Sequence, residues 1–351
     1  MKNSAIHSLA FRYSETLRFG VKTFFSSACI GLLVLTSWAV LAGLAHAQTP
    51  SNDFPSHPIK IIVPQAAGGG TDLIGRRIAQ KLSEQLKVAT VVENKSGAGS
   101  LIGTEYVANS PADGYTLMIG GLFNMVMNKA LIKNLSYEPD RDFVPLGYLS
   151  GYSFVFLTRP DMPVSSLSEF VKFAKEQNKP ITFGTAGIGT LQHVWGEILL
   201  NALGLQTLQV PFKGAAQGYQ EMMAGRVDVM FDNMSASKQL ILNGKLKGLA
   251  LSATDRSPLL PLVPTINETG LTKFTGESWF GVFAPKDTPP ATVNRLRQAL
   301  MVINKDPEFM TQVEKDGGRI INIPVNEQQQ FLKDEIAKWV GLVQKNNIKL
   351  D

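Results

Sequence analysis

Four short segments that each follow an apolar run typical of a strand carry hydroxyl, basic or acidic side chains, and the first three also contain glycine. They are residues 64–72, 184–190, 211–215 and 231–235. Glycine lets main-chain N–H groups approach a bound molecule closely. The first N–H groups of a following helix lack partners and carry partial positive charge, so such a loop can bind an anion. One loop alone is more often a plain connection capped by Thr or Asp; loops in both halves favour an anion site.

Four titratable side chains in or just after these loops leave more than one role open. His193, expected in the first turn of a helix, could donate to a ligand oxygen, or act as a base oriented by Asp232. The second role would make a secreted hydrolase, but no nucleophile motif such as G-x-S-x-G occurs. Lys213 either pairs with a second ligand carboxylate or is solvated. Asp72 would repel an anion, so we expect it to be turned back into its own helix rather than to bind a ligand ammonium group.

Composition excludes several kinds of chemistry. The single cysteine, Cys29, lies in the N-terminal leader, and only His57 and His193 remain beyond it. Disulfides, thiol nucleophiles and multi-histidine metal sites are therefore excluded, and we expect no metal and no cofactor. The glycines of 97–103 lack the acidic residue that a dinucleotide fingerprint needs after the next strand. The net charge is +5 and falls near +2 without the leader, with scattered bases, which disfavours nucleic-acid binding.

The first 47 residues are typical of a secretory signal peptide. Four bases lie among residues 2–22, an apolar stretch covers 24–44, and Ala45-His46-Ala47 follows. An uncleaved membrane anchor is the alternative, but serines and threonines dilute the apolar stretch. We predict cleavage after Ala47 and export to the periplasm.

The loops need elements to position them, and short apolar runs that alternate with helical patterns predict parallel sheets flanked by helices. The first series has predicted strands at 59–63, 90–93 and 115–119. A second series begins after residue 150, with strands at 154–157, 181–183, 207–212, 227–231 and 247–252. The tail adds strands at 279–284 and 320–323 and helices at 290–304 and 326–346. We therefore predict an α/β chain of two lobes, 54–152 plus 277–323 and 153–276 plus 324–351.

Several motifs along the mature chain, in the same order, resemble the substrate-binding receptors of tripartite tricarboxylate transporters, also called the Bug family. They are residues 54–64 with 67–72, 92–94 with 97–99, 113–117, 184–187 with 192–193, 225–233 and 279–285. The resemblance covers essentially the whole mature chain. It implies a two-lobed periplasmic-binding-protein fold of the Venus flytrap kind, in which each lobe is a doubly wound sheet flanked by helices.

The resemblance also implies a function: binding of a small organic carboxylate between the lobes, without catalysis, for delivery to an integral-membrane permease. We expect a monomer. A ligand sensor for a signalling partner is an alternative. Gln65 stands where an aromatic residue is common, which bears on ligand identity. Carried over by position, the implied ligand-binding residues are Gln65, Ala66, Ala67, Gly68, Gly69, Thr71, Phe123, Thr185, Ala186, Gly187, Gly189, Thr190, His193, Lys213, Gly214 and Asp232.

Overall fold

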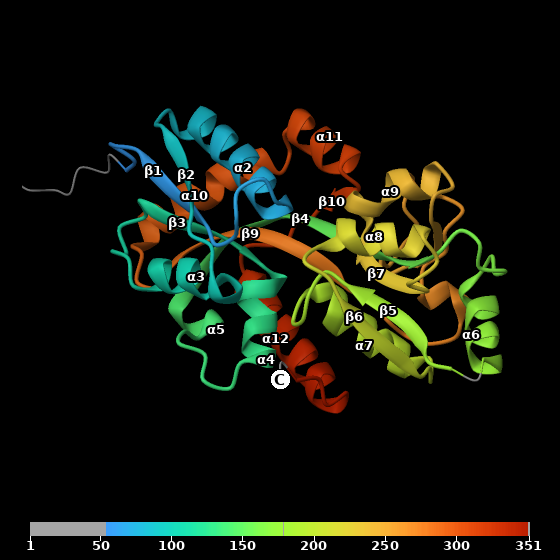
Figure 1. The fold of residues 1–351 in the computed structure, drawn as a ribbon. Helices are drawn as coiled ribbons and strands as arrows, with labels where there is room; N and C mark the ends of the chain where they lie inside the picture. Colours follow the sequence, from blue (N-terminus) through green and yellow to red (C-terminus); the bar gives the residue numbers. More distant parts are fainter. Residues whose placement is uncertain (1–53, 178, 350–351) are drawn as a thin grey trace, which may run out of the picture. The chain divides into compact units, whose positions relative to one another are not determined.

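A mixed sheet runs through the computed structural model, which describes residues 54–177 and 179–349 (Figure 1). The predicted signal peptide, residues 1–47, lies outside these ranges. Among the described residues, ten strands form one sheet in the order β2-β1-β3-β9-β4-β7-β5-β6, and β10 and β8 each pair with β4. In the same ranges we find no helix with the length and apolar character needed to cross a membrane.

The first part of the sheet is parallel and has helices between its strands. β1 (Ile59–Val63) pairs with both β2 (Thr90–Asn94) and β3 (Thr116–Gly121). The connections contain α2 (Gly70–Leu86), the short η1 (Ala98–Ser100) and α3 (Leu101–Ala108). Four of the five side chains of β1 are apolar and buried, and only Lys60 is partly exposed. After β3 come η2 (Phe123–Met127), α4 (Asn128–Leu131) and α5 (Pro139–Asp142).

The second part repeats this arrangement. β5 (Ile181–Thr185) lies parallel to β6 (Thr207–Pro211) and to β7 (Val229–Asn233). Its helices are α6 (Leu167–Glu176), α7 (Leu191–Ala202), α8 (Ala215–Met223) and α9 (Met234–Leu242), followed by β8 (Lys247–Leu251) and η3 (Asn267–Thr269). The predicted strands at 181–183, 207–212 and 247–252 are therefore confirmed, with ends that shift by one or two residues.

Two long antiparallel strands join the parts. β4 (Phe143–Thr158) pairs with β9 (Glu277–Pro285) over Phe143–Ser153 and with β7 over Phe154–Thr158. Figure 1 shows both strands running through the middle of the fold. The sequence prediction placed only 154–157 in a strand and was too short, because the preceding glycines and Pro145 do not resemble a strand. Tertiary pairing overrides that local signal, since β4 is buried along almost its whole length.

The C-terminal elements pack against both parts. α10 (Pro290–Ile303) and α11 (Pro307–Lys315) precede β10 (Gly318–Ile320), which pairs with β4; the strand expected at 320–323 is thus shorter and begins earlier. α12 (Gln328–Lys345) contacts α4 and η2, and its Trp339 ring stacks on Trp195 of α7 with a centroid distance of 4.9 Å. The last helix therefore touches elements of both predicted lobes, and the lobe boundaries stay a prediction.

Candidate functional site

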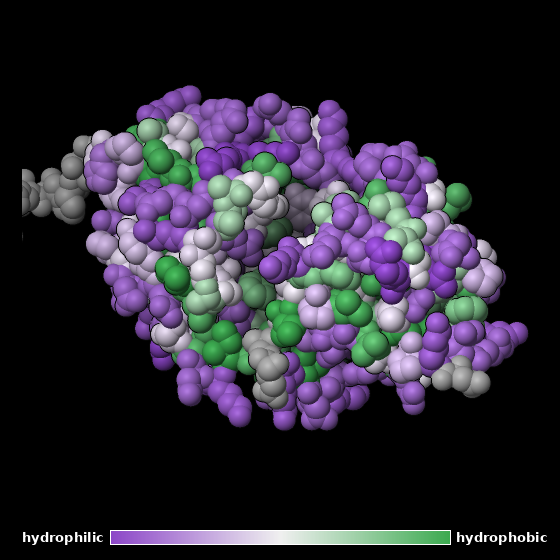
Figure 2. All heavy atoms as spheres, in the orientation of Figure 1, coloured by the Kyte–Doolittle hydropathy of each residue, from purple (hydrophilic) through white to green (hydrophobic). Residues whose placement is uncertain are grey.

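A cavity of about 290 Å³ lies where helices from both parts of the sheet meet its connecting strands. Figure 2 shows the surface hollowed between the part that carries β1–β3 and the part that carries β5–β7. The walls come from the first turns of α2 and α7 and from the segment after β3, and the floor comes from β4 and β9. The lining residues are Pro64, Gln65, Gly70, Thr71, Gly121, Leu122, Phe123, Asn124, Phe154, Thr190, Leu191, Gln192, Asn233, Ser278 and Phe280.

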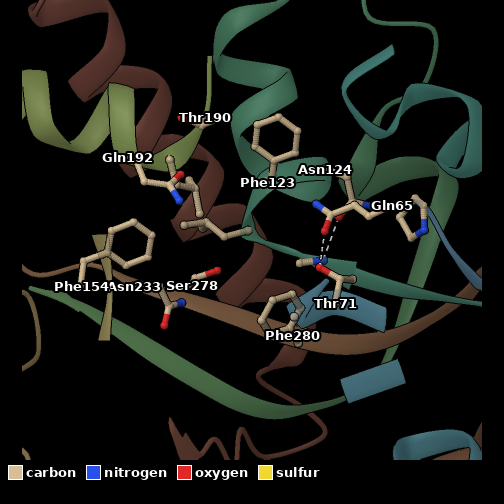
Figure 3. Close-up of a pocket in the computed structure, with 15 residues that line it drawn as sticks. Gln65, Thr71, Phe123, Asn124, Phe154, Thr190, Gln192, Asn233, Ser278 and Phe280 are labelled. Carbon is tan, nitrogen blue, oxygen red and sulfur yellow. Dashed lines mark hydrogen bonds between the residues drawn. The ribbon is translucent and has the colours of Figure 1, made fainter. Parts of the chain in front are cut away.

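None of these described lining residues carries a charge. Their polar groups are amides and hydroxyls, and Figure 3 shows Thr190 and Gln192 on one side of the cavity with Gln65, Thr71 and Asn124 opposite. Asn124 is fixed by its neighbours, because its Oδ1 accepts from the Gly121 N–H at 2.8 Å and its Nδ2 donates to Thr104 Oγ1 at 3.1 Å. The cavity is neutral but rich in oriented dipoles.

The first turn of α2 presents main-chain N–H groups to this cavity. Gly69 is the N-cap, without a side-chain cap, and its carbonyl accepts from the Leu73 N–H at 3.0 Å. The N–H groups of Gly70 and Thr71 have no acceptor among the described residues, and both residues line the cavity. Thr71 Oγ1 donates to Gln65 Oε1, which ties these two lining side chains together.

Asp72 is turned away from the cavity, as predicted. It is 3% exposed, and its carboxylate accepts from the Gly68 N–H at 2.9 Å, from Arg76 Nε at 3.0 Å and from Asn94 Nδ2 at 2.9 Å. Burial opposes ionisation, but these donors outweigh it and hold the pKa of the Asp72 carboxyl below its usual value. The carboxylate therefore stabilises the loop before α2.

The first turn of α7 has a matching arrangement. Thr190 is the N-cap: its Oγ1 accepts from the His193 N–H at 3.3 Å, and its carbonyl accepts from the Val194 N–H. The N–H groups of Leu191 and Gln192 have no acceptor among the described residues. Both residues line the same cavity as Gly70 and Thr71. Two helix N-termini therefore supply partial positive charge to the same cavity.

His193 serves the loop rather than the cavity wall. The side chain is buried; Nδ1 accepts from the Gly189 N–H at 3.0 Å, and Nε2 lies 3.1 Å from Glu197 Oε1. These contacts assign a neutral imidazole with its proton on Nε2. The Gly189 N–H, expected to face a ligand, is therefore already occupied.

Asp232 is buried and holds a residue of the cavity. Its carboxylate accepts from Gln192 Nε2 at 2.9 Å, from Tyr219 Oη at 2.5 Å and from the Asn233 N–H at 2.6 Å. Burial raises the pKa of this carboxyl above its ordinary value despite the three donors. Asp232 and His193 have separate partners, so the acid–base pair that a hydrolase would need is not formed.

The structure brings together only part of the set implied by the resemblance. Gln65, Thr71, Phe123 and Thr190 line the cavity. Thr185 is buried and accepts from Gln209 Nε2 at 3.3 Å. Lys213 is exposed and lies outside the wall. The other residues of the set that the wall does not include are Ala66, Ala67, Gly68, Gly69, Ala186, Gly187, Gly189, His193, Gly214 and Asp232.

The floor residues Phe154, Ser278 and Phe280 were missed by sequence reasoning. Alternation along 277–280 indicates which side chains share a face of β9. It does not indicate that β9 pairs with β4 beneath the helices, because that pairing joins residues more than a hundred positions apart. Among the described residues, no group of His, Cys, Asp and Glu is arranged to hold a metal ion.

An α/β fold with two lobes joined by paired strands, and with a neutral cavity between helix N-termini, defines a solute-binding receptor of the periplasmic type. The model of the tripartite tricarboxylate transporter family receptor matches residues 74–348. The chain belongs to this family, so the predicted family and fold class are confirmed.

Relatives and solved structures agree with this assignment. Protein BugT of Bordetella pertussis is 30% identical, over 92% of this chain and 98% of its own length. The periplasmic binding protein BugD is 32% identical, with a TM-score of 0.72 over 84% of this chain and 99% of its own. MatC from Rhodopseudomonas palustris, solved with bound malate, is 30% identical, with a TM-score of 0.71 over 83% and 100% of the two chains.

Proposed function

We propose that this receptor binds one carboxylate group of a small organic acid in the cavity between α2 and α7. The observation that carries the proposal is the pair of unpartnered N–H groups at each helix start, Gly70 with Thr71 and Leu191 with Gln192, on one neutral cavity. An anion there accepts hydrogen bonds from both lobes at once. Closure of the lobes then follows from binding, because only the closed arrangement satisfies both sets of donors.

The strength of these interactions fits a receptor. A micromolar Kd corresponds to about 8 kcal/mol. A hydrogen bond to a charged group contributes roughly 1.5–3 kcal/mol, and a helix terminus contributes up to ~2 kcal/mol where it is partly buried. Three or four N–H donors and the hydroxyls of the cavity therefore suffice after the cost of association is subtracted. An arginine is not needed.

The family supports the rest of the proposal. A tripartite transporter contains membrane subunits, so we propose that the loaded receptor delivers its ligand to an integral-membrane permease. Malate in MatC is a carboxylate, which supports the ligand class. The leader supports export to the periplasm with cleavage after Ala47. We propose that the mature chain acts there as a monomer. The separate partners of His193 and Asp232 support a receptor that returns its ligand unchanged.

Thermal denaturation of the mature chain in the presence of carboxylates and of their primary amides tests the proposal. The amides match the acids in shape but carry no charge. We expect a rise in Tm with at least one carboxylate and none with its amide, because a ligand at a hundred times its Kd stabilises by about 2.7 kcal/mol. Equal shifts for acid and amide would show that the cavity does not recognise a carboxylate.

A further inference from the structure

A second cavity adjoins the first along the same floor. It also measures about 290 Å³ and shares Gly70, Asn233 and Phe280 with the first cavity. Phe280 lies between the two compartments, and Tyr152 continues the floor beyond it, with the two rings edge to face at 5.9 Å between centroids. The N–H of Gly70 thus lies at the junction, where a ligand in the first cavity would extend into the second.

The two cavities differ in charge. The first has no charged lining residue, whereas the second has Arg77, Lys238 and Asp316. Two of these residues are cationic and only Asp316 is acidic, and the Asp316 carboxylate is already paired with the Arg77 guanidinium. Lys238 has only a neutral partner among the described residues, since its Nζ donates to the main-chain carbonyl of Lys315. The second cavity therefore has an excess of positive charge.

Hydrogen-bond donors remain available in the second cavity. An ammonium has three N–H donors and a guanidinium has five, and Lys238 and Arg77 each use one of them, in their hydrogen bonds to Lys315 and Asp316. The Tyr152 hydroxyl keeps its proton at neutral pH, since its pKa is ordinarily 10 and burial raises it further, to about 12. These groups come from α9, α2 and β4, so an anion among them would contact both lobes.

The passage between the compartments is apolar. Phe280 forms one side, and Leu73 and Ile74 of α2 line the second cavity beside it. Leu73 is 51% exposed, which is unusual for a leucine on a helix whose other apolar residues are buried. A methylene chain would cover this surface and gain hydrophobic stabilisation.

The geometry points to a second anionic subsite in the second cavity, so that the receptor selects dicarboxylates with an apolar chain between their two acid groups. One carboxylate occupies the helix N-termini of the first cavity, and the other lies at Lys238 and Arg77. This inference rests on the proposed function, because it assumes a carboxylate in the first cavity.

Titration calorimetry with matched pairs of acids tests the subsite: butanoate with butanedioate, hexanoate with hexanedioate, and octanoate with octanedioate. We expect at least one dicarboxylate to bind about tenfold more tightly than its monocarboxylate, the effect of one charge-assisted hydrogen bond. Equal affinity within every pair would overturn the subsite alone. Failure of all six acids to bind would overturn the proposed function as well.

Two variants of opposite sign make the test specific. Lys238→Gln should lower the ratio of dicarboxylate to monocarboxylate affinity about tenfold, whereas Asp316→Asn should raise it, because that change frees Arg77 and removes a repulsive charge. Lys245→Gln, on the exposed turn after α9, has the same charge change away from the cavity and should alter neither affinity. A fall in the ratio with Asp316→Asn, or an unchanged ratio with Lys238→Gln, would refute the subsite.

Discussion

The buried carboxylate of Asp232 on β7 accepts a hydrogen bond from the side-chain amide of Gln192 on α7, at 2.9 Å. Gln192 lines the cavity and Asp232 does not. The acid therefore fixes the orientation of a polar side chain at the helix N-terminus without bringing a negative charge to the wall. Asp232 was expected among the residues that bind an anion, where its negative charge would repel the ligand. Its place behind Gln192 removes this difficulty, because the carboxylate does not line the cavity.

Gln192→Ala should raise the Kd of a bound carboxylate about tenfold, because the cavity loses a positioned amide donor. The measurement is titration calorimetry with the carboxylate that gives the largest thermal shift. Gln220→Ala, on the exposed face of α8, removes the same group far from the wall and should leave the Kd unchanged. Similar affinities for the two variants would mean that the Gln192 side chain does not contact the ligand.

The buried carboxyl of Asp232 should make the free energy of unfolding depend on pH. Burial raises the pKa of this carboxyl above its ordinary 3.8, so between the two values the folded chain binds more protons than the unfolded chain. The contribution of Asp232 to the free energy of unfolding therefore falls as pH rises through that window, by about 1.4 kcal/mol for each unit of pKa difference. Urea unfolding at several pH values above 3.8 should show the stability of the parent chain declining relative to Asp232→Asn. A relative gain with rising pH would contradict this.

The fold could be predicted from the sequence where local pattern and tertiary role agree. β1 and β5 are short apolar runs that each follow a proline and precede a glycine-containing loop, and their bounds match the prediction closely. β4 was predicted too short because Gly147 and Gly151 weaken the strand pattern. Added Cβ atoms there would lie 3.3 Å from Leu300 Cβ and 2.7 Å from Ile321 Cδ1, so close packing explains these glycines.

The sequence indicated which loops to consider for the site, but not which of their groups are available to a ligand. The glycine loops led us to predict two helix N-termini at one site, and the first turns of both α2 and α7 line one cavity. They did not indicate which N–H groups stay unpartnered, because Gly189 donates to His193 and Gly68 donates to Asp72. Each of these two glycine N–H groups donates to a side chain four residues later in the chain, so it is not available to a ligand. The available donors lie a few residues later, in the first turns of the helices.

Two glycines inside helices should respond in opposite directions to alanine. At Gly196 of α7 an added Cβ would lie 2.0 Å from Cζ of the buried Phe183, whereas at Gly341 of α12 no atom lies within 4 Å. Alanine favours a helix over glycine by about 1 kcal/mol, but overpacking a core costs typically 1–3 kcal/mol or more. Gly196→Ala should therefore lower the midpoint of chemical unfolding, and Gly341→Ala should raise it. Stabilisation by Gly196→Ala would show that Phe183 does not pack as described.

Substitutions of His193 distinguish a positioning role of this side chain from a catalytic one. His193→Ala should weaken carboxylate binding about three- to tenfold, because the Gly189 N–H loses its acceptor and the turn before α7 loosens. His193→Asn, whose side-chain oxygen can replace Nδ1 as that acceptor, should recover most of the affinity. Calorimetry measures both variants, and chromatography of the ligand after long incubation with the parent chain detects any product. Product that forms with the parent chain and disappears with His193→Ala would mean that the chain is an enzyme and not a receptor. Equal weakening by Ala and Asn would instead mean that the imidazole itself is required.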